Sequence, residues 1–162
     1  MSLYSSHLPL DANPQVGNNF KLAEFIGLNA PQSCMEYKGN NIGCLATNGS
    51  GLKMEQICKR LSELEGASSP LSVDFGPAIP KKILIVTGSA ADSLYHFESL
   101  GFDTLITGEP KQFAYHFAKE RGLNAIFAGH YATETLGVKA VGNLLENQFN
   151  IKSNFINVPT GI

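Results

Sequence analysis

The stretch AGHYATET, residues 128–135, contains two side chains that commonly bind metal ions or carry protons. His130 and Glu134 stand four residues apart, after an apolar run and at the start of a helical pattern. On a helix this spacing places both side chains on one face, where imidazole and carboxylate can share a divalent cation. The same pair also occurs by chance in ordinary strand-to-helix turns. The spacing alone leaves both interpretations open.

Other polar residues follow apolar runs that are typical of strands. In an open α/β sheet, sites form beyond the carboxyl ends of the strands. If these strands are parallel neighbours, two histidines and three acids converge on one edge: His7, Asp11, Glu109, His130 and Glu134. His96 and His116 fall inside predicted helices and are weaker candidates.

This set of side chains favours zinc, iron, manganese or nickel over calcium. Three ligands from separate segments can hold an ion and leave one position open for water, which the ion acidifies. Ordinary structural roles compete with this interpretation. Asp11 can form a turn in LDANP, Glu109 can simply precede a helix, and His116 can lie on a helix surface.

Strand and helix patterns alternate along the chain, which predicts an α/β fold. Helices are expected over residues 18–27, 51–66, 91–101, 110–122 and 134–148, the last capped by Thr133. A hairpin is expected over 34–47, an edge strand or loop over 68–80, and strands over 82–88, 103–108, 124–129 and 154–159. Strands separated by helices pair in parallel, so we expect a mostly parallel mixed sheet flanked by helices, with an antiparallel element at the hairpin.

The composition suits one soluble domain over residues 1–162. Hydrophobic residues make up 43% of the chain, charged residues 16%, and the net charge is -2, so no global basic field favours nucleic acid. No apolar run approaches the ~20 residues of a membrane span. Three cysteines without CxxC spacing are typical of reduced thiols, which indicates a cytoplasmic protein.

Three segments resemble a known family. HLPLDANPQVGNN (7–19), LITGEPKQFAYHFAKERGL (105–123) and AGHYATETLGVKAVGNLL (128–145), with NFINVP near the end, are similar to the Nif-three-like dinuclear metal-centre proteins. Members are often labelled GTP cyclohydrolase I type-two homologues. The likeness runs in order over nearly the whole chain, and GHYATE is its most specific part.

The resemblance implies two divalent metal ions in a cleft of an α/β fold. By motif, Asp11, His130 and Glu134 would be metal ligands, and His7 would stand close to the metals as a proton carrier. Glu109 and His116 would line or buttress the site.

The chain departs from the family pattern in one respect. The family also uses two adjacent histidines from an N-terminal segment, and this sequence contains no His-His dipeptide. We therefore expect an N-terminally incomplete chain, equivalent to the C-terminal two-thirds of a short member. Three matched ligands stand where five are expected, so one ion or none is expected in this chain.

Two functions follow from the resemblance. The first is a metal-dependent hydrolase that uses metal-activated water on a purine nucleotide, as the cyclohydrolase label suggests. The second is a non-catalytic metal-binding protein that works through assembly or interaction. The family also implies a homo-oligomer, a ring-like hexamer, as the partner arrangement.

Overall fold

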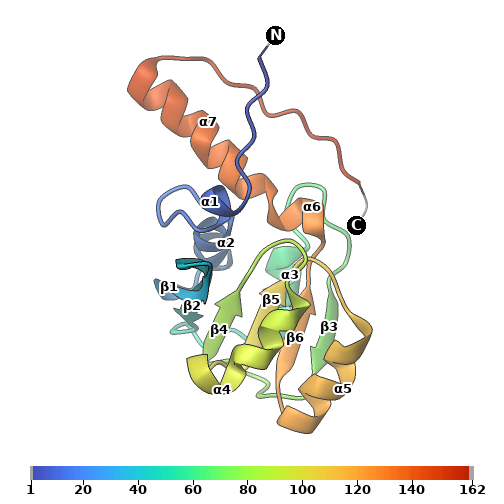
Figure 1. Ribbon diagram of the computed structural model, residues 1–162. Coiled ribbons are helices and arrows are strands. Elements are labelled where there is room, and N and C mark those ends of the chain that lie inside the picture. The colour runs from blue at the N-terminus through green and yellow to red at the C-terminus, as the bar shows by residue number, and fades with distance from the viewer. Residues whose placement is uncertain (1, 161–162) are drawn as a thin grey trace.

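The computed structural model describes residues 2–160 and shows a six-stranded sheet between two layers of helices (Figure 1). The strands are β1 (Asn29–Tyr37), β2 (Asn40–Thr47), β3 (Leu71–Asp74), β4 (Lys82–Ile85), β5 (Thr104–Thr107) and β6 (Asn124–Phe127). The helices are α1 (Leu8–Asp11), α2 (Asn18–Ile26), α3 (Met54–Leu61), the 3-10 helix η1 (Ala91–His96), α4 (Phe97–Leu100), α5 (Gln112–Arg121), α6 (His130–Thr133) and α7 (Thr135–Phe149). Among these helices none is long and apolar enough to cross a membrane.

The sheet is mixed, with strand order β1-β2-β4-β5-β6-β3. β4, β5 and β6 pair in parallel, as their connecting helices predict. β1 and β2 form the predicted hairpin, and β2 joins β4 antiparallel. β3 lies at the opposite edge, antiparallel to β6. The α/β prediction is therefore confirmed, and the parallel pairing is confined to the three central strands.

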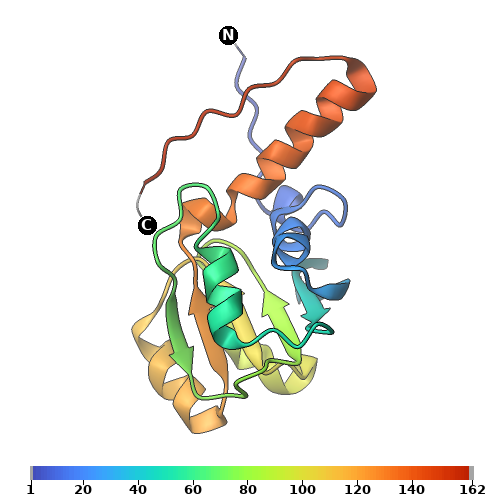
Figure 2. The same ribbon diagram turned by 180° about the vertical axis from the view of Figure 1, so that it is seen from behind.

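The central strands are mostly apolar in their interiors because helices cover both of their faces. Ile83, Ile85 and Ile106 point to one face and pack with α2 and α3. Leu84 and Leu105 point to the other face and pack with η1, α4 and α5. In Figure 2, which is seen from behind, α3 lies in front of the sheet, and α4 and α5 lie on its far side. The parallel register, in which Ile85 pairs with Ile106 and Ile106 with Ile126, places the carboxyl ends of β4, β5 and β6 side by side.

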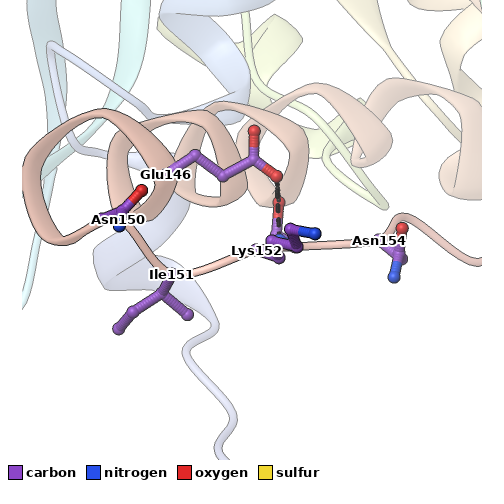
Figure 3. A pocket seen from close by; sticks show the side chains of 6 residues that line it. Glu146, Asn150, Ile151, Lys152 and Asn154 are labelled. Atoms are coloured by element: carbon purple, nitrogen blue, oxygen red, sulfur yellow. Dashed lines mark hydrogen bonds between the residues drawn. The ribbon is translucent and has the colours of Figure 1, made fainter.

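α7 projects from the body, and only Thr135 and Gly137 of it are buried. It ends at Asn150 in the left-handed conformation, with φ 54°. Residues 151–160, here called the C-terminal arm, then run back along the molecule (Figure 1). The turn is fixed by Glu146, whose Oε1 accepts hydrogen bonds from the backbone N–H of Ser153 (2.8 Å) and from its hydroxyl (3.0 Å), as Figure 3 shows.

Two sequence-based expectations are wrong. The strand expected over residues 154–159 does not form, because the arm lies on α7 and α6 rather than beside a sheet edge. Thr133 does not cap the long helix, which begins one residue later, after Glu134. The Thr133 hydroxyl instead donates to the carbonyl of His130 (3.0 Å) and accepts from the N–H of Gly88 (3.3 Å).

Candidate metal centre

The carboxyl ends of the central strands open into a cleft of about 470 Å³. Asp11, the last residue of α1, and His7, the residue before α1, both line this cleft. His130, the first residue of α6, and Glu134, the residue after α6, line it as well. Four of the six predicted site residues therefore meet in one cavity, although they are separated by more than a hundred positions of the chain. Both helices lie at the same end of the sheet in Figure 1.

His130 is oriented by a carboxylate on the neighbouring strand end. Its Nδ1 hydrogen-bonds Oε1 of Glu109, which lies two residues after the end of β5. The hydrogen bond from His130, together with one from Ser89, lowers the pKa of Glu109. The other ring nitrogen, Nε2, lies toward Glu134, and both residues line the cleft. This arrangement matches the carboxylate–histidine pairs that orient metal-binding imidazoles.

Glu134 lies against the other nitrogen of the same ring, with Oε1 3.3 Å from Nε2 of His130. Burial raises the pKa of Glu134, and the negative charge of Asp11 raises it further, against the opposing effect of His130. Burial alone would lower the pKa of His130, but Glu109, Glu134 and Asp11 outweigh that effect and raise it. The cleft thus concentrates negative charge around one imidazole, and such a field attracts a cation.

Asp11 is 7% exposed and is held by Asn18 of α2, whose Nδ2 donates to its Oδ1 at 2.7 Å. The other end of the Asn18 amide accepts the N–H of Gly137 at 2.6 Å. One buried amide therefore joins α1 to the start of α7. A side chain at Gly137 would meet Asn18, since a Cβ there would lie 2.6 Å from Oδ1.

The adjacent amide of Asn19 links α2 to β2 and to the segment that follows β4. It is fully buried, donates from Nδ2 to the carbonyl of Ile42 (2.7 Å) and accepts the N–H of Thr87 (2.8 Å). Sequence reasoning assigned no role to Asn18 or Asn19. Two adjacent amides at the start of an otherwise apolar helix were the available indication, because buried amides require partners.

Gly88 leaves space for the side chains of Glu134 and His130, because it has no Cβ. It follows β4 with φ +74°, and a Cβ there would collide with Oε1 of Glu134 and lie 3.1 Å from Nε2 of His130. The loop VTGSAAD thus lies against the candidate metal donors. Its Thr87 is buried, and the Thr87 hydroxyl has no hydrogen-bond partner within the described part of the chain.

The donors fit a divalent cation by chemistry but are not closed around a point. Within residues 2–160, no three His, Cys, Asp or Glu side chains stand ready to hold one ion. Asp11 Oδ1 is engaged by Asn18, and His130 Nε2 by Glu134. Binding of one ion by Asp11, His130 and Glu134 would therefore require these side chains to turn toward a common point.

The remaining histidines are placed differently from the sequence-based expectation. His116 lies on the exposed face of α5, beside Tyr115, and does not line the cleft. The reason is that α5 buries its alanine face, Ala114 and Ala118, against the sheet. His96, also a weaker candidate from its helical position, does line the cleft as the last residue of η1.

The chain is similar to known proteins over nearly its whole length. Residues 1–161 match the model of the family described as Duf34/NIF3 (NGG1p interacting factor 3). A Deinococcus radiodurans protein named "GTP cyclohydrolase 1 type 2 homolog" is 36% identical over the whole chain, and a Pyrococcus horikoshii protein of the same name is 39% identical. The chain spans 61% and 64% of those two proteins, respectively.

Solved structures show the same fold. Protein ybgI, described as of unknown function, superposes with a TM-score of 0.87 at 29% identity, over 98% of this chain and 62% of its own. TTHA1606 from Thermus thermophilus superposes with a TM-score of 0.81 at 38% identity, over the same shares. The reduced HcgD of Methanocaldococcus jannaschii shares the fold alone, at 22% identity. The family match over nearly every residue, on a fold shared with these structures, makes this chain a member of the Duf34/NIF3 family.

Proposed function

We propose that this protein binds divalent metal ions and acts as a metal-dependent hydrolase. One observation carries the proposal: two acids and one imidazole from opposite ends of the chain, Asp11, Glu134 and His130, line a single cleft. Burying like charges together without a cation is unfavourable. A divalent ion would remove that cost.

Each residue then has a distinct task. The ion would be held by Asp11, His130 and Glu134. Glu109 orients the His130 ring, and Asn18 orients the Asp11 carboxylate, each through a hydrogen bond. A bound cation of this kind supplies Lewis-acid activation of water. His7, which is exposed and lines the cleft, would be placed to carry a proton to or from the reacting group.

The substrate class is proposed from the relatives. The name "GTP cyclohydrolase 1 type 2 homolog" on several of them supports a purine nucleotide whose ring carbon is attacked by water. Zinc, iron, manganese and nickel are the candidate ions, because the donors are imidazole and carboxylate.

Metal content tests the site. The purified chain is stripped with a chelator, incubated with Zn²⁺ or Mn²⁺, desalted and assayed for bound metal. We expect Asp11→Ala and His130→Ala to lose most of the metal, whereas His116→Ala, the exposed histidine outside the cleft, keeps it. Equal metal in all four proteins would refute the assignment of these ligands.

Turnover tests the reaction separately. The metal-loaded protein is incubated with GTP, and ring-opened product is sought by absorbance and mass spectrometry. We expect product that depends on His7 and on the metal. Binding of metal without turnover of any purine nucleotide would refute the hydrolase and leave the non-catalytic alternative.

The alternative function, a metal-binding protein of assembly or interaction, has support from the C-terminal arm. Ile151, Ile156 and Val158 are exposed there at 53%, 79% and 66%, and such a concentration of apolar surface is typical of interfaces. A homo-oligomer, such as a ring, would bury this apolar surface.

Light scattering tests this alternative. The double variant Ile156→Asp, Val158→Asp should be monomeric, whereas the parent should be oligomeric. A monomeric parent would refute it.

A further inference from the structure

A second cavity opens beside the candidate metal centre. It has a volume of about 890 Å³ and lies between α1 and the β1–β2 hairpin. His7, Leu8, Tyr37 and Ile42 line both this cavity and the metal-centre cleft. The two cavities are therefore adjacent around His7 and Tyr37, and one ligand can reach from one into the other. The second one is within the size range of small-molecule sites, roughly 300–1,000 Å³.

The two cavities differ in charge. The metal-centre cleft is lined by carboxylates, among them Asp11, Asp92 and Glu134. Among the residues that line the hairpin cavity there is no carboxylate. Lys38, at the turn of the hairpin, supplies the basic group of this cavity. The amides of Asn13, Asn40 and Asn41 and the hydroxyl of Ser33 supply neutral hydrogen-bonding groups.

Those neutral groups include donors that remain free for a ligand. Asn13 uses its Oδ1 to accept the backbone N–H groups of Gln15 and Val16, which leaves the NH₂ group of the same amide to donate to a ligand. A lysine ammonium with amide donors around it favours an anion, and phosphate oxygens in particular accept several such hydrogen bonds at once.

Tyr37 stands where the two cavities meet. It is 46% exposed, and the ammonium of Lys38 lies 5.2 Å from the centre of its ring. An exposed aromatic ring provides a stacking surface for a flat heterocycle. A planar ring on Tyr37 would have His7 and the metal donors on one side and Lys38 on the other.

We propose that the hairpin cavity binds the phosphate end of a phosphorylated heterocycle, with Lys38 pairing to the phosphate and Tyr37 stacking on the ring. The ring itself extends toward His7, Asp11 and His130. This inference rests on the proposed function for what happens to the ring, but the binding it describes needs no catalysis. Lys38 and Tyr37 are thus residues that determine specificity for a nucleotide-like ligand.

Calorimetry of the purified chain in chelator-containing buffer tests the binding alone. The ligands are GTP, guanosine and inorganic triphosphate, which separate ring from anion. We expect Lys38→Met to weaken GTP binding by about tenfold or more and to leave guanosine unaffected, since only a charge-assisted contact is lost. We expect Tyr37→Leu to weaken guanosine and GTP alike, by about 5- to 100-fold.

Lys59→Met is the matched control, because Lys59 is exposed on α3 and lines neither cavity. Equal GTP affinity of the Lys38 and Lys59 variants would overturn the phosphate site. The stacking surface would be overturned if triphosphate bound as tightly as GTP and Tyr37→Leu had no effect. Absence of GTP binding to the parent would overturn both the phosphate site and the stacking surface.

This inference and the proposed reaction fail in different ways. If GTP binding depends on Lys38 but GTP is not turned over, only the proposed reaction is refuted. Turnover without Lys38 dependence refutes only this inference.

Discussion

Asn18 offers the sharpest test of how the candidate metal centre is held, because it acts on the proposed ligand Asp11 through a hydrogen bond. Its amide is 3% exposed and spans two elements, donating to Asp11 Oδ1 at 2.7 Å and accepting from the N–H of Gly137 at 2.6 Å. Asn18→Ala removes both hydrogen bonds and leaves a buried carboxylate oxygen and a buried N–H without partners.

The structure sets the expected magnitude. An unsatisfied buried polar group costs about 1–3 kcal/mol, and water entering the space left by alanine would recover part of this. We expect Asn18→Ala to lower the free energy of unfolding by about 2–4 kcal/mol, which for a chain of this size lowers the melting temperature by about 5–15 °C. Because Asp11 loses its orienting donor, affinity for Zn²⁺ or Mn²⁺ should fall by about 10- to 100-fold.

Two measurements and two further variants complete the test. Circular dichroism during heating and denaturant titration measure stability without metal, and calorimetry measures metal affinity below the melting transition. Asn147→Ala, at an exposed position of α7, is the matched control. Asn18→Asp keeps the acceptor for Gly137 but sets a second carboxylate against Asp11, so it should be less stable than the parent at neutral pH.

An Asn18→Ala protein that melts with the parent and binds metal with the parent's affinity would refute the reasoning. Loss of stability with unchanged metal affinity would refute the orienting role and leave Asn18 as a link between α1, α2 and α7.

Three further predictions concern the same region and the core. Gly88→Ala should lower metal affinity at least tenfold and destabilise by about 1–2 kcal/mol, because φ is +74° and the new methyl group meets Glu134; unchanged metal content would contradict this. Glu109→Gln should weaken metal binding by about tenfold, since the partner of His130 Nδ1 loses its charge; the chelator concentration that removes half the metal measures it. Burial raises the pKa of the Cys44 thiol to about 12, so the unfolded chain releases that proton first as pH rises above ~8.5. The free energy of unfolding should then fall with rising pH up to about 12, less steeply in Cys44→Ala, and identical slopes would contradict the assignment.

Local residue patterns were sufficient to predict most of the elements. The apolar runs before Gly88, Gly108 and Gly129 predicted β4, β5 and β6, because strands covered on both faces carry apolar residues throughout. The turn at Lys38 and Gly39 predicted the hairpin, since both residues take positive φ there. The family resemblance supplied the site residues Asp11, His130 and Glu134, which spacing alone left open.

Only the tertiary structure decided which side chains share a cleft. His116 and His96 both fall in helical patterns in the sequence. The packing of their helices leaves His116 on the surface and places His96 in the lining of the cleft. The roles of Asn18 and Asn19 also depend on contacts with residues as far away as Gly137 and Thr87, which no local pattern encodes. Local hydrogen-bonding and burial preferences act over a few residues, so the sequence by itself determined the elements; the packing of distant elements determined the site.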